Sequence, residues 1–336
     1  MVAAEGVGFE PTDGCPSLVF KTSAIDHSAT PPDPSDNLTL TWRMSCDPTG
    51  GCGSRNSTMS LEDFIHRHQS LTVLTGAGCS TDSGIPDYRD LEGQWKRTPP
   101  MTYQIFTATE LARQRYWARS MLGWPLIAAA RPNAAHRALA ALERRRKLTV
   151  LITQNVDGLH QQAGSRNVID LHGRLDRVIC LQCHTLSDRV DLQHRMIAMN
   201  PAWLERAADI APDGDADLDG MDFSGFRIPP CEVCGGILKP DVVYYGESVP
   251  RDRPAAGMAA LEASDALLVV GSSLMVFSGF RFARKARDLG LPIASINLGV
   301  SRADDFLDLR IREKAADALS FLMDAQSEVV GTSLQA

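Results

Sequence analysis

The stretch Leu71-Thr72-Val73-Leu74-Thr75-Gly76-Ala77-Gly78 decides the fold. Its first five residues form a short apolar run, which is typical of a strand buried in a parallel sheet. The glycines that follow let backbone N–H groups approach a diphosphate that a Cβ atom would hold off. The segment therefore predicts a buried strand that leads into a phosphate-binding turn. On this fragment alone an ordinary strand-to-loop turn stays open.

The same strand signal recurs three times along the chain, and helical patterns lie between the strands. The strands are expected at Leu148–Thr153, Ala266–Val270 and Pro292–Asn297, and the helices at Asn133–Arg146, Phe277–Asp288 and Ala315–Met323. A further short helix should start at the capping-box-like Ser60-Leu61-Glu62-Asp63 and run to about His68. Alternating strands and helices predict an α/β fold, a Rossmann-like parallel sheet with helices on both faces.

Polar residues follow most of these strands. They are Gln154–His160, His172 with Gly173, Gly271–Ser273 and Asn297–Gly299. In an open α/β sheet the carboxyl ends of the strands form the ligand side, so we expect these residues to meet in one crevice. The segment Ile85–Arg89 continues the first turn, and the guanidinium of Arg89 is suited to a phosphate.

Four cysteines form two C-x-x-C pairs, Cys180 with Cys183 and Cys231 with Cys234, with 47 residues between Cys183 and Cys231. Nothing in the first residues resembles a secretion signal, and in a reducing compartment paired cysteines indicate a metal before a disulfide. The donor set predicts one structural zinc ion rather than four unliganded thiols. We place the protein in the cytoplasm and assign residues 177–245 to a small zinc-binding module inserted into the larger domain.

The remaining domain limits follow from composition. Residues 1–58 are rich in Pro, Gly, Ser and Thr, and we expect a disordered extension. Gly8-Phe9-Glu10-Pro11 is what the transfer-RNA-like sequence GGGTTCGAACCC encodes, which favours a true start at Met44 or Met59. The dinucleotide-binding domain should comprise residues 59–176 and 246–326, with a flexible tail at 327–336.

Overall composition excludes several classes of protein. Charged residues make up 22% and hydrophobic residues 44%, near globular averages. A net charge of -7 argues against direct nucleic-acid binding. No apolar run approaches the roughly 18 residues that would span a membrane.

Together these motifs resemble the ordered motif series of the sirtuins, the NAD-dependent protein deacylases. The resemblance runs from about Ser60 to Met323 and includes the four cysteines and Lys239–Glu247. Arg115–Arg119, Gly123–Pro125 and the acidic Pro212–Asp215 resemble the class II branch. The resemblance implies that an acyl group passes from lysine to ADP-ribose and that nicotinamide is released. The substrates would be acyl-lysine proteins, whereas the acyl chain and the oligomeric state stay open.

The resemblance also implies roles for individual residues. His172 would act as general base on a ribose hydroxyl, with Asn155 and Asp157 beside it as catalytic residues. The residues expected to bind NAD are Gly76, Ala77, Gly78, Ser80, Asp87, Tyr88, Arg89, Gln154, Asn155, Asp157, Gly271, Ser272, Ser273, Asn297, Leu298, Gly299 and Ala315. Two positions depart from the family pattern: Tyr88 replaces a Phe, and Cys79 stands where an aliphatic residue is usual. We expect Cys79 to be a small buried hydrophobe.

Substrate residues are expected in two places. Val242, Val243, Tyr244, Gly246 and Glu247 lie in an extended segment that could pair with substrate backbone, or that is simply another sheet strand. Tyr116 and Arg119 have a Y-x-x-R spacing that holds acidic acyl groups in a related branch, although on a helix this spacing also suits a solvated face.

Two other functions remain open from the sequence. An ADP-ribosyltransferase would use the same NAD site and pass ADP-ribose to a protein. A non-catalytic NAD- and zinc-binding scaffold would need none of the polar residues His172, Asn155 and Asp157.

Overall fold

The structure is a computed structural model that describes residues 59–96, 100–204, 209–210, 216–217 and 221–324. The predicted extension at residues 1–58, the tail at 327–336 and the Pro212–Asp215 segment lie outside the described residues. Within the described part, no helix is both long and apolar enough to cross a membrane.

Ten α-helices and eleven strands are described. The helices are α1 (Leu61–Arg67), α2 (Tyr103–Ala108), α3 (Glu110–Ala129), α4 (Ala134–Arg144), α5 (Leu159–Gln162), α6 (Arg189–Met199), α7 (Asp252–Glu262), α8 (Phe277–Asp288), α9 (Ala315–Ala318) and α10 (Phe321–Asp324). The strands are β1 (Leu71–Thr75), β2 (Leu148–Thr153), β3 (Val168–Asp170), β4 (Gly173–Cys180), β5 (Leu186–Asp188), β6 (Asp209–Ile210), β7 (Ala216–Asp217), β8 (Leu238–Val242), β9 (Ala266–Val270), β10 (Ile293–Ile296) and β11 (Leu309–Ile311).

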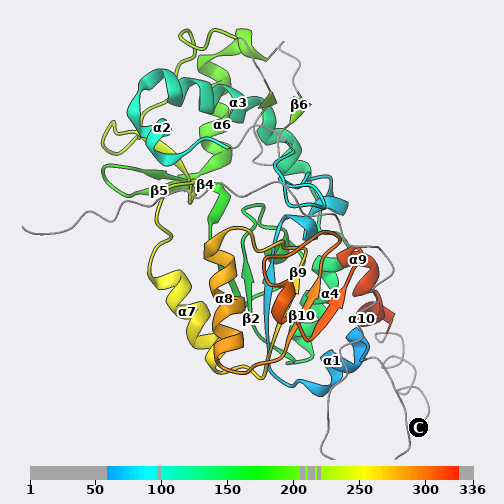
Figure 1. Cartoon of the computed structure of the whole chain (residues 1–336). Coiled ribbons are helices and arrows are strands. Elements are labelled where there is room, and N and C mark those ends of the chain that lie inside the picture. Colours follow the sequence, from blue (N-terminus) through cyan, green and yellow to red (C-terminus); the bar gives the residue numbers. More distant parts are fainter. Residues whose placement is uncertain (1–58, 97–99, 205–208, 211–215, 218–220, 325–336) are drawn as a thin grey trace, which may run out of the picture. The chain divides into compact units, whose positions relative to one another are not determined.

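The largest sheet has the strand order β11-β10-β9-β1-β2-β3 (Figure 1). Every pairing in it is parallel; Leu71–Thr75, for example, pair in register with Ala266–Val270. The chain builds the sheet outward from β1, first in one direction through β2 and β3, then in the other through β9 to β11. This order confirms the Rossmann-like prediction, and its reversal between β1 and β9 is where such sheets bind ligands.

Helices cover both faces of this sheet, as Figure 1 shows. Val73 and Leu268 belong to the hydrophobic cluster that includes α1, α4, α9 and α10. Leu74 and Val269, the next residue along each strand, belong to the cluster that includes α7 and α8. Successive side chains on a strand point to opposite faces, so the apolar runs are buried on both sides.

Helix ends follow local chemistry. The capping box predicted at Ser60 is confirmed, because its hydroxyl accepts from the Asp63 N–H and the Asp63 carboxylate accepts from the Ser60 N–H. Asn133 also caps α4, because its side-chain oxygen accepts from the Ala135 N–H at 2.9 Å. The prediction of one helix over 315–323 is wrong. Two short helices, α9 and α10, stand there instead, since the turn between them lets Leu319 and Leu322 both reach the core.

A second, antiparallel sheet has the order β5-β4-β8 and carries the cysteine pairs at its end. Helices α2, α3 and α6 share its hydrophobic cluster, in which Trp117 is fully buried. The Trp117 indole N–H donates to the Leu238 carbonyl at 3.3 Å. Helices α2 and α3 therefore pack with the zinc-module sheet, although residues 59–176 were assigned by sequence to the other domain.

The loops after β1 and β9 touch each other at glycines. A Cβ atom on Gly271 would lie 2.3 Å from the Cys79 nitrogen, and one on Gly76 would lie 2.7 Å from the Ser272 Cβ. Gly78 donates its N–H to the Gly271 carbonyl at 2.9 Å. Gly271 also has a φ of +62°, which side-chain-bearing residues rarely adopt. The contact between the two loops thus depends on the absence of side chains.

Substituting Gly271 tests this contact. Gly271→Ala should lower the free energy of unfolding by about 3 kcal/mol, the sum of roughly 1–2 kcal/mol for the left-handed backbone and roughly 1–3 kcal/mol for the clash. Gly290→Ala is the matched control, because Gly290 has a φ of +68° and open space around its Cβ position. It should cost about 1–2 kcal/mol in urea denaturation. Equal losses in the two variants would contradict the contact.

Candidate active site

Two adjoining cavities lie at the carboxyl ends of β1, β2 and β9. The larger has a volume of about 610 Å³ and the smaller about 180 Å³. Both are lined by Ala77, Tyr88, Gln154, Asn155 and His172. The polar strand ends that the sequence predicted to meet are therefore brought together along one continuous wall.

The hydrogen bonds of His172 define its protonation. Its Nδ1 lies 3.0 Å from the Gln154 carbonyl oxygen, which can only accept, so Nδ1 carries the proton. Its Nε2 lies 2.7 Å from the Ser278 hydroxyl, which donates to the remaining lone pair. The imidazole thus presents a basic nitrogen in the cavity, and its ring is held from two sides.

Burial lowers the pKa of His172 to about 4, and the charges of Arg253 and Arg281 act in the same direction. The hydrogen bond to the Gln154 carbonyl raises the pKa but does not offset burial. The imidazole is therefore neutral around pH 7, as a group that accepts a proton must be.

Asn155 and Asp157 form a network with Ser80. The Ser80 hydroxyl donates to Asp157 Oδ2 at 2.7 Å, and Asn155 Nδ2 donates to the Ser80 Oγ and to the Gly76 carbonyl, both at 3.0 Å. The Leu159 N–H donates to the second Asp157 oxygen at 2.9 Å. Burial raises the pKa of Asp157 despite these bonds. The network ties the loop after β2 to the loop after β1.

Gln154 connects the same wall to the loop after β9. Its side-chain amide donates to the Ser272 Oγ at 2.7 Å and contacts the Thr75 carbonyl at 3.3 Å. A Cβ atom on Gly279 would lie 2.4 Å from the Gln154 Oε1, so α8 also approaches this side chain closely. One glutamine therefore bridges β1, the loop after β9, and α8.

All residues expected to bind the dinucleotide line one or both cavities. Ser80 and Asp157 line the larger one only, and the smaller one is lined by Gly76, Ala77, Gly78, Asp87, Tyr88, Arg89, Gln154, Asn155, Gly271, Ser272, Ser273, Asn297, Leu298, Gly299 and Ala315. One expectation changes in detail: the N–H groups of Gly76 and Gly78 donate to the carbonyls of Val270 and Gly271. These two glycines join loops in this structure.

The segment expected to bind substrate backbone lies beside the larger cavity. Strand β8 pairs with β4 as an ordinary sheet strand and ends at Val242. The buried ammonium of Lys239, within β8, forms a 3.0 Å ion pair with Glu247 beyond the strand end, and the Glu247 carboxylate also accepts from the Tyr244 N–H. This pair fixes the turn that presents residues 242–247 to the cavity.

Tyr116 and Arg119 differ in their relation to the cavity. Tyr116 is buried against Phe106 and Tyr244 and lines the larger cavity. Arg119 is half-buried one turn later on α3 and lines neither cavity.

Some cavity residues were missed by sequence reasoning. Ser278 contacts His172 directly, and Phe277, Arg251 and Arg281 line the larger cavity. The only signal for Ser278 was its place as the second residue of the expected helix over 277–288, but its contact is with a residue 106 positions away in the sequence. Met275 and Val276, which precede α8, line the smaller cavity, and Val276 also lines the larger one.

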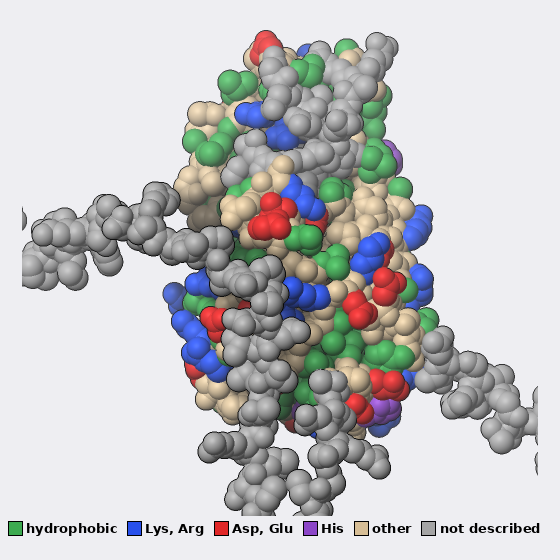
Figure 2. Space-filling view, turned by 45° about the vertical axis from the view of Figure 1, so that its right-hand side comes forward, with side chains coloured by type: hydrophobic (Ala, Val, Ile, Leu, Met, Phe, Trp, Pro, Cys, Tyr) green, Lys and Arg blue, Asp and Glu red, His purple; other side chains and the backbone are tan. Residues whose placement is uncertain are grey.

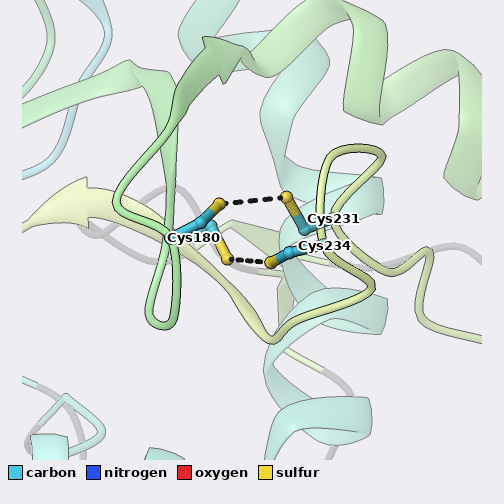
Figure 3. A group of neighbouring side chains, drawn as sticks. Cys180, Cys231 and Cys234 are labelled. Carbon is cyan, nitrogen blue, oxygen red and sulfur yellow. Dashed lines mark hydrogen bonds between the residues drawn. The ribbon is translucent and has the colours of Figure 1, made fainter.

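The four predicted zinc ligands lie together at one end of the second sheet. Cys180 Sγ lies 3.5 Å from Cys234 Sγ, and Cys183 Sγ lies 3.7 Å from Cys231 Sγ (Figure 3). Four sulfurs at about 2.3 Å from one zinc ion would be about 3.8 Å apart, so the cluster fits a structural zinc. The Gln182 N–H donates to Cys180 Sγ at 3.4 Å, which favours a thiolate there.

Comparison with known proteins agrees with this geometry. A model of the Sir2 family matches residues 76–278. A Xanthomonas campestris protein named NAD-dependent protein deacetylase is 58% identical over 263 residues, which are 78% of this chain and 90% of the relative. The chain belongs to the Sir2 family. Another member, NAD-dependent protein deacetylase 1 of Streptomyces coelicolor, is 49% identical over 89% of this chain and 98% of its own.

Solved structures of Sir2 proteins share the fold. One described as the structural basis for the mechanism and regulation of Sir2 enzymes has a TM-score of 0.61 at 32% identity. The match covers 77% of this Sir2-family chain and 93% of the solved chain. A complex of Sir2 with a p53 peptide and NAD+ has a TM-score of 0.61 at 27% identity, and the match covers 79% of this chain and 97% of the solved chain.

The buried imidazole of His172 makes a pH-dependent prediction. Its folded pKa of about 4 lies below the 6.5 of an exposed histidine, so the unfolded chain binds the extra proton first and stability falls as pH drops from 6.5 toward 4. Between pH 7 and 5 the loss from this residue should be about 2 kcal/mol. In urea denaturation, the free energy of unfolding of His172→Gln should therefore fall by about 2 kcal/mol less than that of wild type between pH 7 and 5. Parallel pH dependences would contradict the burial of the neutral ring.

Proposed function

We propose that this Sir2-family chain is an NAD-dependent protein lysine deacylase that transfers the acyl group to ADP-ribose and releases nicotinamide. The observation that carries the proposal is the basic Nε2 of His172 in a cavity continuous with the glycine-walled cavity at the β1/β9 switch point. The names of the relatives in Xanthomonas and Streptomyces support the same activity.

The smaller cavity suits the diphosphate and adenosine ribose of NAD. Its lining includes four glycines and two serines, with Arg89 and Lys314 as cations and Asp87, Asp90 and Glu313 as acids. Small residues allow close approach of a diphosphate, and cations balance its charge. NAD, when bound, would supply the electrophilic ribose carbon that accepts the acyl oxygen.

The larger cavity would hold the nicotinamide ribose and the acyl-lysine. His172 Nε2 would take a proton from a ribose hydroxyl, with the Gln154 carbonyl holding the Nδ1 proton throughout. Ser278 acts as a positioning residue, because its hydroxyl keeps the ring in place before substrate enters. Asn155 and Asp157 would orient the nicotinamide end from the loop after β2.

Acyl-lysine proteins are the proposed partners. Residues 242–247, which line the larger cavity, would pair with the backbone of these proteins. On the face drawn in Figure 2, Lys and Arg side chains are interspersed with Asp and Glu, which fits a protein partner better than a phosphate backbone. We place the enzyme in the cytoplasm, where reducing conditions keep cysteines available to zinc. Membership of the class II branch is part of the proposal and rests on the Arg115–Arg119 and Gly123–Pro125 motifs.

The direct assay uses an acetyl-lysine peptide with NAD and mass spectrometry. We expect nicotinamide and acetyl-ADP-ribose in equal amounts, and a loss of about 10²- to 10⁴-fold in kcat for His172→Ala. His194→Ala, at an exposed histidine on α6, should leave the rate unchanged. ADP-ribose stably attached to protein without acetyl-ADP-ribose would instead establish an ADP-ribosyltransferase.

An acyl panel tests the proposed contact of Tyr116 and Arg119 with acidic acyl groups. If Arg119 reaches the acyl carboxylate in the substrate complex, Arg119→Gln should lower kcat/KM for a glutaryl-lysine peptide about 10- to 100-fold, the range for a lost charged hydrogen bond. The value for acetyl-lysine should stay constant. Equal effects on the two peptides would remove Arg119 from the acyl site.

A further inference from the structure

A second cluster of metal-ligating side chains lies behind the NAD wall. Cys79, His136 and His160 each offer one ligand atom, and these atoms lie within 4.8 Å of one another. All three residues are at most 1% exposed. They come from the turn after β1, from α4 and from α5. Cys79 is as buried as the sequence predicted, but two imidazoles surround it.

The hydrogen bonds of His160 leave one nitrogen available. The Thr75 hydroxyl donates to Thr153 Oγ1 at 2.9 Å, so at its 2.9 Å contact with His160 Nε2 it must accept. Nε2 therefore carries the proton and Nδ1 carries a lone pair. Nδ1 is buried and has no hydrogen-bond partner among the described residues. Buried acceptors are nearly always satisfied, so an unpaired one indicates a missing ligand.

His136 places a second imidazole beside the first. The two rings have centroids 4.7 Å apart and are tilted by 54°. His136 Nδ1 lies 3.0 Å from Asn133 Oδ1 and 3.3 Å from the Asn133 backbone nitrogen, and its Nε2 makes only a long 3.4 Å contact with the Ser80 hydroxyl. A metal on Nε2 requires the proton on Nδ1, where Asn133 Oδ1 can accept it and orient the ring, as oxygen acceptors outside the ligand set do for metal-binding histidines.

Burial raises the pKa of the Cys79 thiol, and the negative charge of Asp157 raises it further, so Cys79 stays a neutral thiol until a cation takes the place of its proton. Burial also lowers the pKa of both histidines, so the rings are neutral and free to coordinate. A divalent ion would be balanced by one thiolate and the nearby Asp157 carboxylate.

We propose that Cys79, His136 and His160 form a second zinc site, separate from the four-cysteine cluster, and that zinc bound there inhibits the NAD site. A thiolate and imidazoles are donors that zinc prefers, and three of them leave a fourth position open. Zinc at about 2.0–2.3 Å from each ligand holds the ligand atoms about 3.4–3.6 Å apart, a spacing that lies within the 4.8 Å that encloses these atoms, and the thiol proton leaves to solvent.

Ser80 couples the zinc site to the NAD site. It follows Cys79 directly, and its hydroxyl joins Asp157 to Asn155 on the cavity wall. Zinc on His136 Nε2 would replace the contact of that nitrogen with the Ser80 hydroxyl, and zinc on Cys79 would restrain the residue that precedes Ser80. The inhibition rests on the proposed function, whereas zinc binding does not.

Metal counting tests the binding. Full-length wild type, Cys79→Ala and Cys79→Val are exposed to excess zinc, desalted and analysed for zinc per chain. Wild type should hold one more ion than either variant, while His194→Ala should match wild type. Because the comparison is a difference, thiols elsewhere in the chain, such as Cys15, Cys46 and Cys52, cancel. Equal zinc contents in wild type and both Cys79 variants would overturn the site.

Added zinc tests the coupling. Zinc should inhibit NAD-dependent deacetylation by wild type, and Cys79→Ala and Cys79→Val should need at least about tenfold more zinc for the same inhibition, since a ligand is lost. Equal inhibition of all three proteins would overturn the coupling. If wild type shows no deacetylase activity, the proposed function fails, and the zinc count still decides whether the site exists.

Discussion

The structure depends on one constraint: the loop after β1 and the loop after β9 meet with no side chain between them. Gly76, Gly78 and Gly271 leave the space that this requires, and the resulting backbone contacts place Ser272 against Gln154. From there the network continues through the Gln154 carbonyl to His172 and through Asn155 to Ser80. The His172 imidazole is thus positioned by the contact that closes the crevice.

Much of the fold could be predicted from the sequence because its central strands are buried on both faces. Continuous apolar runs define Leu148–Thr153 and Ala266–Val270 with the bounds that the structure has. Helix α8 was also predicted over its full length, since it is amphipathic, whereas α7 was missed because Pro254 and Gly257 interrupt its pattern. Gly257 is explained only by packing: a Cβ there would lie 2.8 Å from the Phe282 ring.

The candidate site could likewise be predicted from the sequence only in part. The cysteine cluster and the polar strand ends could be found because spacing and strand position determine them. Ser278 could not, since its role is a contact across 106 residues, and neither could the grouping of Cys79 with two histidines from separate helices. The sequence identified Cys79 as unusual, but only the packing of α4 and α5 shows what surrounds it.

The most direct test of the central claim is a crystal structure with NAD and an acetyl-lysine peptide bound. The account predicts the diphosphate along the loops after β1 and β9 and a ribose hydroxyl within hydrogen-bonding distance of His172 Nε2. A dinucleotide bound away from the β1/β9 switch point, or an imidazole separated from the ribose by protein, would contradict it.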